Sequence, residues 1–202
     1  MPDVNTPQLE AIDETGSGLR LSFYWHGDRY AHRVSLVDGG AEATSLLASV
    51  EDVGDDPAWP CSPPLQQLHI EDRAGGAAAM LVGMAGRSHW SMSVESRPAA
   101  RELHFDLACR LQQRPEMPLS TRYRLEHAAL VASEADRIRF TVGAQTALLL
   151  FEVAIATDRI RCNVQPGQIG LSIAVPAVPR PTTIRWRYTV KLEPYHIAMR
   201  TD

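Results

Sequence analysis

Apolar side chains recur at every second position in about ten short segments of this chain. In one of them, Leu19, Leu21 and Phe23 alternate with Arg20 and Ser22. A period of two places successive side chains on opposite faces of a β-strand. Strands that are apolar on one face and polar on the other are typical of antiparallel sheets with one solvated face. The sequence therefore predicts an all-β fold.

Two antiparallel sheets that pack face to face would bury both apolar faces, so we predict a two-sheet β-sandwich. A closed or partly open antiparallel β-barrel is the alternative, because alternation alone does not separate the two. The sequence has 202 residues, and we expect a single all-β domain over residues 19–202. Residues 1–18 carry four acids and no periodicity, which predicts a flexible acidic N-terminal tail.

The composition limits the partners and the cellular compartment that we expect for this protein. Formal net charge is −4, and we expect no nucleic-acid partner. The apolar runs are too short to span a membrane, and residues 1–18 lack the apolar region of a signal peptide. Cys61, Cys109 and Cys162 are odd in number, with no metal-type spacing. These features favour a soluble, cytoplasmic protein without a cofactor or a dedicated metal.

Charge is distributed unevenly along the sequence. Residues 1–100 hold 14 acids and 6 bases, whereas residues 101–202 hold 10 acids and 14 bases. Several of the later arginines lie two positions apart, opposite the apolar face of their strand: Arg122, Arg124, Arg137, Arg139, Arg185 and Arg187. If their strands are neighbours, one sheet gains a basic outer face. We predict these residues as a binding surface for an anionic small molecule or an acidic protein surface; ion pairing in solvent is the alternative.

A second polar cluster is predicted on one hairpin. His89, Ser91 and Ser93 alternate with apolar residues, and His104 and Asp106 do so on the next strand. The linker at residues 97–100 is short, so the strands should pair antiparallel, with Ser93 near His104 and Ser91 near Asp106. These five residues are the candidate catalytic set. His89, His104 and Asp106 are also candidate ligands for a divalent metal.

The loop at residues 51–64 combines acids, prolines and Trp59. Asp52, Asp55 and Asp56 are candidate ligands for a hard cation such as Ca²⁺. Trp59 is a candidate aromatic platform for a ligand, and the alternative is a rigid connection that plugs one end of the sandwich. His32 falls on an apolar face, where we expect a core histidine with a satisfied hydrogen bond.

The preferred functional hypothesis is a non-enzymatic module that binds a ligand or partner through a polar or basic sheet face. The sequence contains no nucleophile elbow, zinc-protease motif or phosphate-binding loop. A hydrolytic or metal-assisted enzyme centred on His89, His104 and Asp106 is the first alternative. A structural subunit of a homo-oligomer is the second.

Overall fold

The computed structural model describes residues 6–39, 42–51, 58–134, 137–142, 145–150, 160–177 and 179–193. These residues form fifteen strands and one short 3-10 helix, η1 (Pro98–Ala100). Sheet A contains seven strands: β1 (Gln8–Ile12), β2 (Ser17–His26), β3 (Arg29–Asp38), β4 (Thr44–Ser49), β9 (Leu119–Leu125), β13 (Ile160–Gln165) and β14 (Gln168–Ile173). Sheet B contains eight: β5 (Gln67–Arg73), β6 (Gly76–Ala85), β7 (Ser88–Arg97), β8 (Glu102–Leu111), β10 (Ala129–Ser133), β11 (Arg137–Val142), β12 (Gln145–Leu150) and β15 (Thr182–Leu192).

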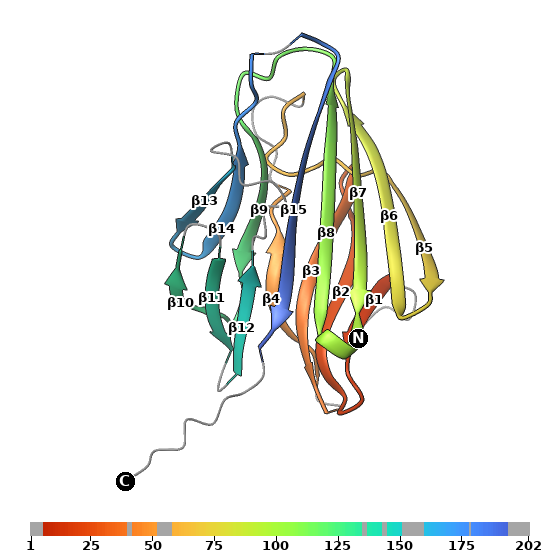
Figure 1. Cartoon of the computed structure of the whole chain (residues 1–202), viewed down its shortest axis with the longest axis vertical. Helices are drawn as coiled ribbons and strands as arrows, with labels where there is room; N and C mark the ends of the chain where they lie inside the picture. Colours follow the sequence, from red (N-terminus) through yellow and green to blue (C-terminus); the bar gives the residue numbers. More distant parts are fainter. Residues whose placement is uncertain are drawn as a thin grey trace.

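The two sheets are open, antiparallel layers that pack face to face. The strand order is β1-β2-β3-β4-β9-β14-β13 in sheet A and β10-β11-β12-β15-β8-β7-β6-β5 in sheet B. Figure 1 shows the long strands β6, β7, β8 and β15 in front of β1, β2 and β3. Within the described residues neither sheet closes on itself. The predicted β-sandwich is confirmed, and the barrel alternative is excluded for these strands.

The core follows directly from the alternation in the sequence. Leu19, Leu21 and Phe23 of β2 are fully buried between the sheets. The two layers are also tied by an aromatic contact. Tyr123 of β9 in sheet A meets Tyr188 of β15 in sheet B edge to face, with ring centroids 6.1 Å apart. These contacts fix which face of each strand is turned outward.

β15 joins distant parts of the sequence. It pairs with β8 over ten residue positions on one side and with β12 on the other. Its inward side chains Trp186, Tyr188 and Val190 are at most 2% exposed. A strand late in the chain therefore lies inside sheet B rather than at its edge.

The prediction of a tail over residues 1–18 is wrong for part of that range. Gln8–Ile12 form β1, which pairs with β2 at the edge of sheet A. Leu9 and Ala11 are 1% and 0% exposed, whereas the side chains of Gln8 and Glu10 face outward. Two inward side chains are too few to stand out as a periodic pattern. Residues 1–5 lie outside the described residues.

Residues 64–66 form a strap that covers one end of the core next to β6. The backbone N–H of Tyr30 donates to the Leu65 carbonyl at 2.6 Å, and that of Gln66 donates to the Val82 carbonyl at 2.8 Å. A side chain at Gly83 would place its Cβ 1.8 Å from the Pro64 carbonyl oxygen. Only glycine permits this approach, so the strap and β6 are held in close backbone contact.

Candidate functional site

The outer face of sheet B collects most of the residues predicted as functional. In β7 the side chains of Trp90, Met92 and Val94 are buried, so those of Ser91 and Ser93 point outward. The same alternation turns the polar side chains of β8 and β15 to this face. The prediction that these polar residues share one sheet face is correct. The face includes a polar hollow and a mainly apolar one.

The predicted pairing of β7 with β8 is wrong by two residues. Ser93 lies opposite Asp106 rather than His104, and Glu95 takes the position opposite His104. The connection runs through η1 to Arg101, whose φ is +54°. A two-residue hairpin turn needs a residue with a positive φ, usually glycine. The ring of Pro98 holds its φ negative, so the turn is longer than expected. A shift of two leaves every side chain on its predicted face.

The polar hollow has a volume of about 560 Å³ and lies over β7, β8 and β15. Its lining includes Ser93, Arg97, His104, Asp106, Arg185 and Arg187. The structure thus brings together five residues that the sequence predicts in two separate groups. Arg97 was not predicted, although its position in the alternation of β7 places it on the same face.

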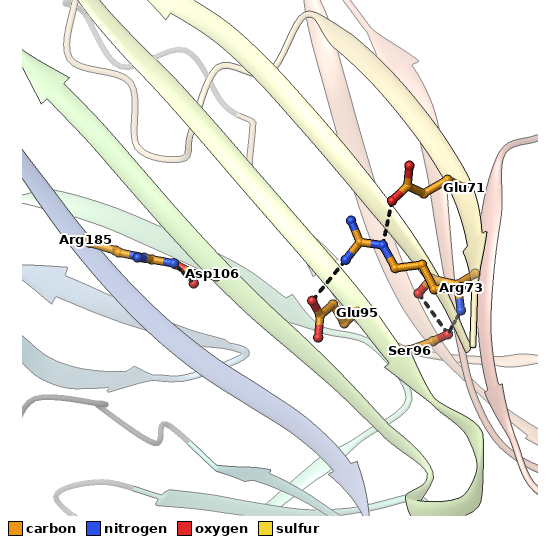
Figure 2. A network of polar contacts seen from close by, with 7 residues as sticks. Glu71, Arg73, Glu95, Ser96, Asp106 and Arg185 are labelled. Atoms are coloured by element: carbon orange, nitrogen blue, oxygen red, sulfur yellow. Dashed lines mark hydrogen bonds and ion pairs between the residues drawn. The ribbon is translucent and has the colours of Figure 1, made fainter. Parts of the chain in front are cut away.

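Asp106 organises the centre of this hollow. Its two carboxylate oxygens accept from Nε and Nη2 of Arg185, and one of them also accepts from Arg187 Nε at 2.7 Å. Figure 2 shows Arg185 and Asp106 meeting end to end from neighbouring strands. Burial favours a higher pKa for Asp106, but the hydrogen bonds and charges of Arg185 and Arg187 outweigh it, so its pKa is lowered. One carboxylate therefore fixes two guanidinium groups.

A second ion-pair cluster borders the polar hollow. Glu102 accepts from Lys191 Nζ at 2.8 Å and lies 2.8 Å from Nε2 of His104. Nδ1 of His104 faces the Thr189 hydroxyl at 3.4 Å. Burial favours a higher pKa for Glu102, and the partners Lys191 and His104 bring it below its ordinary value. Both ring nitrogens of His104 thus have partners other than a serine, and no hydrogen bond in the described chain joins His104 to Ser93.

Arg73 lies at the edge of this face, on strand β5. Its guanidinium lies between Glu71 of β5 and Glu95 of β7, at 2.6 Å and 3.3 Å, as Figure 2 shows. Beside it, the Ser96 hydroxyl donates to the Ala77 carbonyl. Glu95 lines the polar hollow, and its charge is therefore already matched by a cation from the edge strand.

His89 lies apart from His104. It is opposite Arg110, which is six residues along β8 from His104, or about 20 Å in an extended strand. His89 and Ser91 line the other, mainly apolar hollow. Within the described ranges, no group of three or more His, Cys, Asp or Glu side chains is arranged to hold a metal ion. His89, His104 and Asp106 therefore do not converge on one point.

The predicted basic face is divided between the two sheets. Arg122 and Arg124 lie on β9 of sheet A, whereas the other predicted arginines lie on β11 and β15 of sheet B: Arg137, Arg139, Arg185 and Arg187. Most of these cations are ion-paired, for example Arg124 with Glu126 at 3.1 Å and Arg139 with Glu193 at 3.5 Å. The sequence predicts the outward direction of these side chains but not which strands are neighbours.

Of the four loop candidates, Trp59 alone lies within the described residues. Trp59 is 7% exposed and belongs to the core cluster, so its ring offers no platform to a ligand. Its burial agrees with the alternative of a plug at one end of the sandwich. Asp52, Asp55 and Asp56 lie outside the described residues.

One buried polar group was placed correctly by the sequence. His32 is 4% exposed, and its Nε2 lies 2.8 Å from the Tyr123 hydroxyl, as expected for a core histidine with a satisfied hydrogen bond. The Tyr123 hydroxyl in turn bonds to that of Tyr188. These hydrogen bonds run from His32 and Tyr123 in sheet A to Tyr188 in sheet B. The hydrogen bonds of the two tyrosines were not predicted, because their positions in the alternation indicate ordinary core residues.

Comparisons with known proteins give no relative from which to transfer a function. No protein-family model matches this chain, and no curated protein is significantly similar to it. Among the described residues, no helix is long and apolar enough to cross a membrane. The site therefore has to be interpreted from its own geometry.

Proposed function

We propose that this protein is a non-enzymatic binding module that takes up a small anionic molecule in the polar hollow of sheet B. The observation that carries the proposal is the sharing of Asp106 between Arg185 and Arg187. Two cations on one carboxylate leave a positive charge at the centre of the hollow. The guanidinium groups are held in place before a ligand arrives, which lowers the entropy lost on binding.

Donors remain available on these arginines. Arg187 uses only Nε on Asp106, and its side chain is 45% exposed. Its terminal N–H groups make no hydrogen bond within the described residues, and their fork matches a carboxylate or a phosphate. Arg97 adds a further cation, which has no ion pair within the part of the chain that the structure describes. These features support an anionic ligand over a cationic or neutral one.

The alternative of a hydrolytic enzyme receives less support from the same contacts. A nucleophile must lie within hydrogen-bond reach of its base. His104 instead contacts Glu102 and Thr189, and His89 lies in the other hollow. Within the described residues, the hydroxyl of Ser93 therefore makes no hydrogen bond to a histidine that could take its proton.

Isothermal titration of the protein with inorganic phosphate, succinate and glycerol phosphate tests this proposal. We expect at least one of these anions to bind, and Arg187→Ala to weaken that binding about tenfold or more, since a hydrogen bond to a charged group is lost. Arg124→Ala is the matched control, because Arg124 is also exposed and also paired with a carboxylate, on the other sheet. Equal losses in the two variants, or no binding by any of the three anions, would contradict the proposal.

A further inference from the structure

β6 departs from the alternation of apolar inward and polar outward residues that β7 and β15 of the same sheet follow. Its outward positions are apolar along its length: Ala78, Met80, Val82 and Met84. An antiparallel strand with one solvated face should carry polar residues there. Val82 and Met84 are instead 47% and 48% exposed. Part of this strand therefore presents an uncovered apolar surface.

This surface forms one side of the apolar hollow, which has a volume of about 470 Å³. Val82 and Met84 line it from β6, and Ala108 lines it from β8. Ligand sites for small molecules commonly have volumes of about 300–1,000 Å³ and mostly apolar walls with a few polar groups. The hollow has both properties.

The wall of the hollow is fixed by Gln66. Its side-chain amide donates to the Met84 carbonyl at 3.0 Å and accepts from the Met84 N–H at 2.8 Å. One amide therefore satisfies both backbone groups of Met84, as a neighbouring strand would. The hollow exists before a ligand enters, so little ordering is needed on binding.

One cation accompanies the apolar wall. Arg110 of β8 lines the hollow and is exposed. Within the described residues it makes no ion pair, in contrast to Arg185 and Arg187 on the neighbouring strand. The lining also includes Ser91, opposite Ala108, and Thr183, opposite Arg110. An apolar wall beside an unmatched cation is complementary to an anion with an apolar body.

We infer that this apolar hollow is a second binding site, for a small organic anion with an apolar body, such as a medium-chain carboxylate. Val82, Met84 and Ala108 contact the apolar body, and Arg110 binds the carboxylate. This inference goes beyond the proposed function, since it concerns a different hollow and a different cation.

Isothermal titration with octanoate, acetate and 1-octanol separates the two parts of this assignment. We expect octanoate to bind at least about 100-fold more tightly than acetate, because several methylenes leave water. Met84→Gln should weaken octanoate binding several-fold. Met117→Gln, which changes an equally exposed methionine outside this hollow, should leave it unchanged.

Variants of Arg110 and Arg187 test which arginine binds the carboxylate of octanoate. Arg110→Gln should weaken octanoate binding about tenfold without changing that of 1-octanol. Arg187→Ala should leave octanoate binding intact, so that failure at this hollow is distinguished from failure at the polar one.

Three results would overturn the inference. The first is equal affinity for octanoate and acetate, which would remove the role of the apolar wall. The second is an Arg110→Gln variant that binds octanoate like the wild type. The third is a dimer in sedimentation that Met84→Gln converts to a monomer, since a second copy of the chain would then cover this surface.

Discussion

At the scale of the residue, the most constrained polar group is His32. It lies in the core between the sheets, and its backbone N–H donates to the Ser49 hydroxyl at 2.9 Å while its ring contacts Tyr123. Burial lowers its pKa from the ordinary value of 6.5 to about 4. The ring is therefore neutral in the folded protein at neutral pH. Protonating it would put an unmatched charge into an apolar interior.

This burial makes the stability of the fold depend on pH. Between pH 6.5 and about 4 the unfolded chain binds more protons at His32 than the folded chain does, so the contribution is complete above pH 6.5 and declines as the pH falls. We expect the free energy of unfolding to be about 2 kcal/mol smaller at pH 5 than at pH 7 for this reason. Urea denaturation at a series of pH values measures it.

Two variants isolate the residue responsible. His32→Gln keeps an amide that can bond to Tyr123 but does not titrate, so its stability should vary less between pH 7 and pH 5. His69→Gln is the control, because the side chain of His69 is 69% exposed. A His32→Gln variant with the same pH dependence as the wild type would show that another group is responsible.

At the scale of the element, β1 shows how a short strand contributes to the core. It makes an edge of sheet A, where Leu9 lies opposite Leu21 of β2. The Phe23 N–H also donates to the Pro7 carbonyl at 2.9 Å, which extends the pairing by one bond. Residues predicted as a tail therefore complete one side of the sandwich.

Leu9→Ala tests whether β1 is an integral part of the fold. Since Leu9 is 1% exposed, we expect the substitution to reduce the free energy of unfolding by about 2–4 kcal/mol. Gln8→Ala, on the exposed side of the same strand, should change it by less than about 0.5 kcal/mol. Chemical denaturation of the two variants gives both values. A Leu9→Ala variant as stable as the wild type would agree with a mobile tail instead.

The elements also show what a sequence pattern leaves open. Alternation placed Ser93 and Asp106 on one face, because side-chain direction depends only on position within the strand. It did not place Ser93 opposite Asp106, since register depends on the length of the turn, and the turn included Arg101. Arg110 and Met84 also have outward positions in their strands. Whether they line a hollow depends on the neighbouring strands and on the Gln66 amide.

At the scale of the whole molecule, the fold class followed from local pattern, whereas the arrangement of the strands did not. Most of the strands show period-two alternation in the sequence, and two sheets of such strands bury their apolar faces only against each other. Which sheet a strand joins is decided by contacts far apart in sequence. Arg124 and Arg185 were predicted as parts of one surface, yet they lie on opposite sheets because β9 pairs with β4 and β14.

The central position of β15 leads to a prediction for the whole fold. A chain that ends at residue 177 lacks this strand, which leaves β8 paired only with β7 and removes Trp186 and Tyr188 from the core. We expect that chain to lack the near-ultraviolet circular dichroism of the folded protein. A synthetic peptide of residues 179–193, added in excess, should restore the signal, whereas the same peptide with Trp186→Ser should not. A native spectrum without the peptide would contradict this expectation.

The same position bears on synthesis in the cell. A ribosome makes the chain from its N-terminus, so β8 emerges more than 70 residues before its partner. During that interval β8 has a free hydrogen-bonding edge beside β7, and unpaired edges of this kind are where nascent chains associate wrongly. Sheet B cannot form completely until β15 has been translated. We therefore expect folding of this protein during synthesis to depend on slow release from the ribosome or on chaperones. The dependence should be greater than for a sandwich whose last strand lies at a sheet edge.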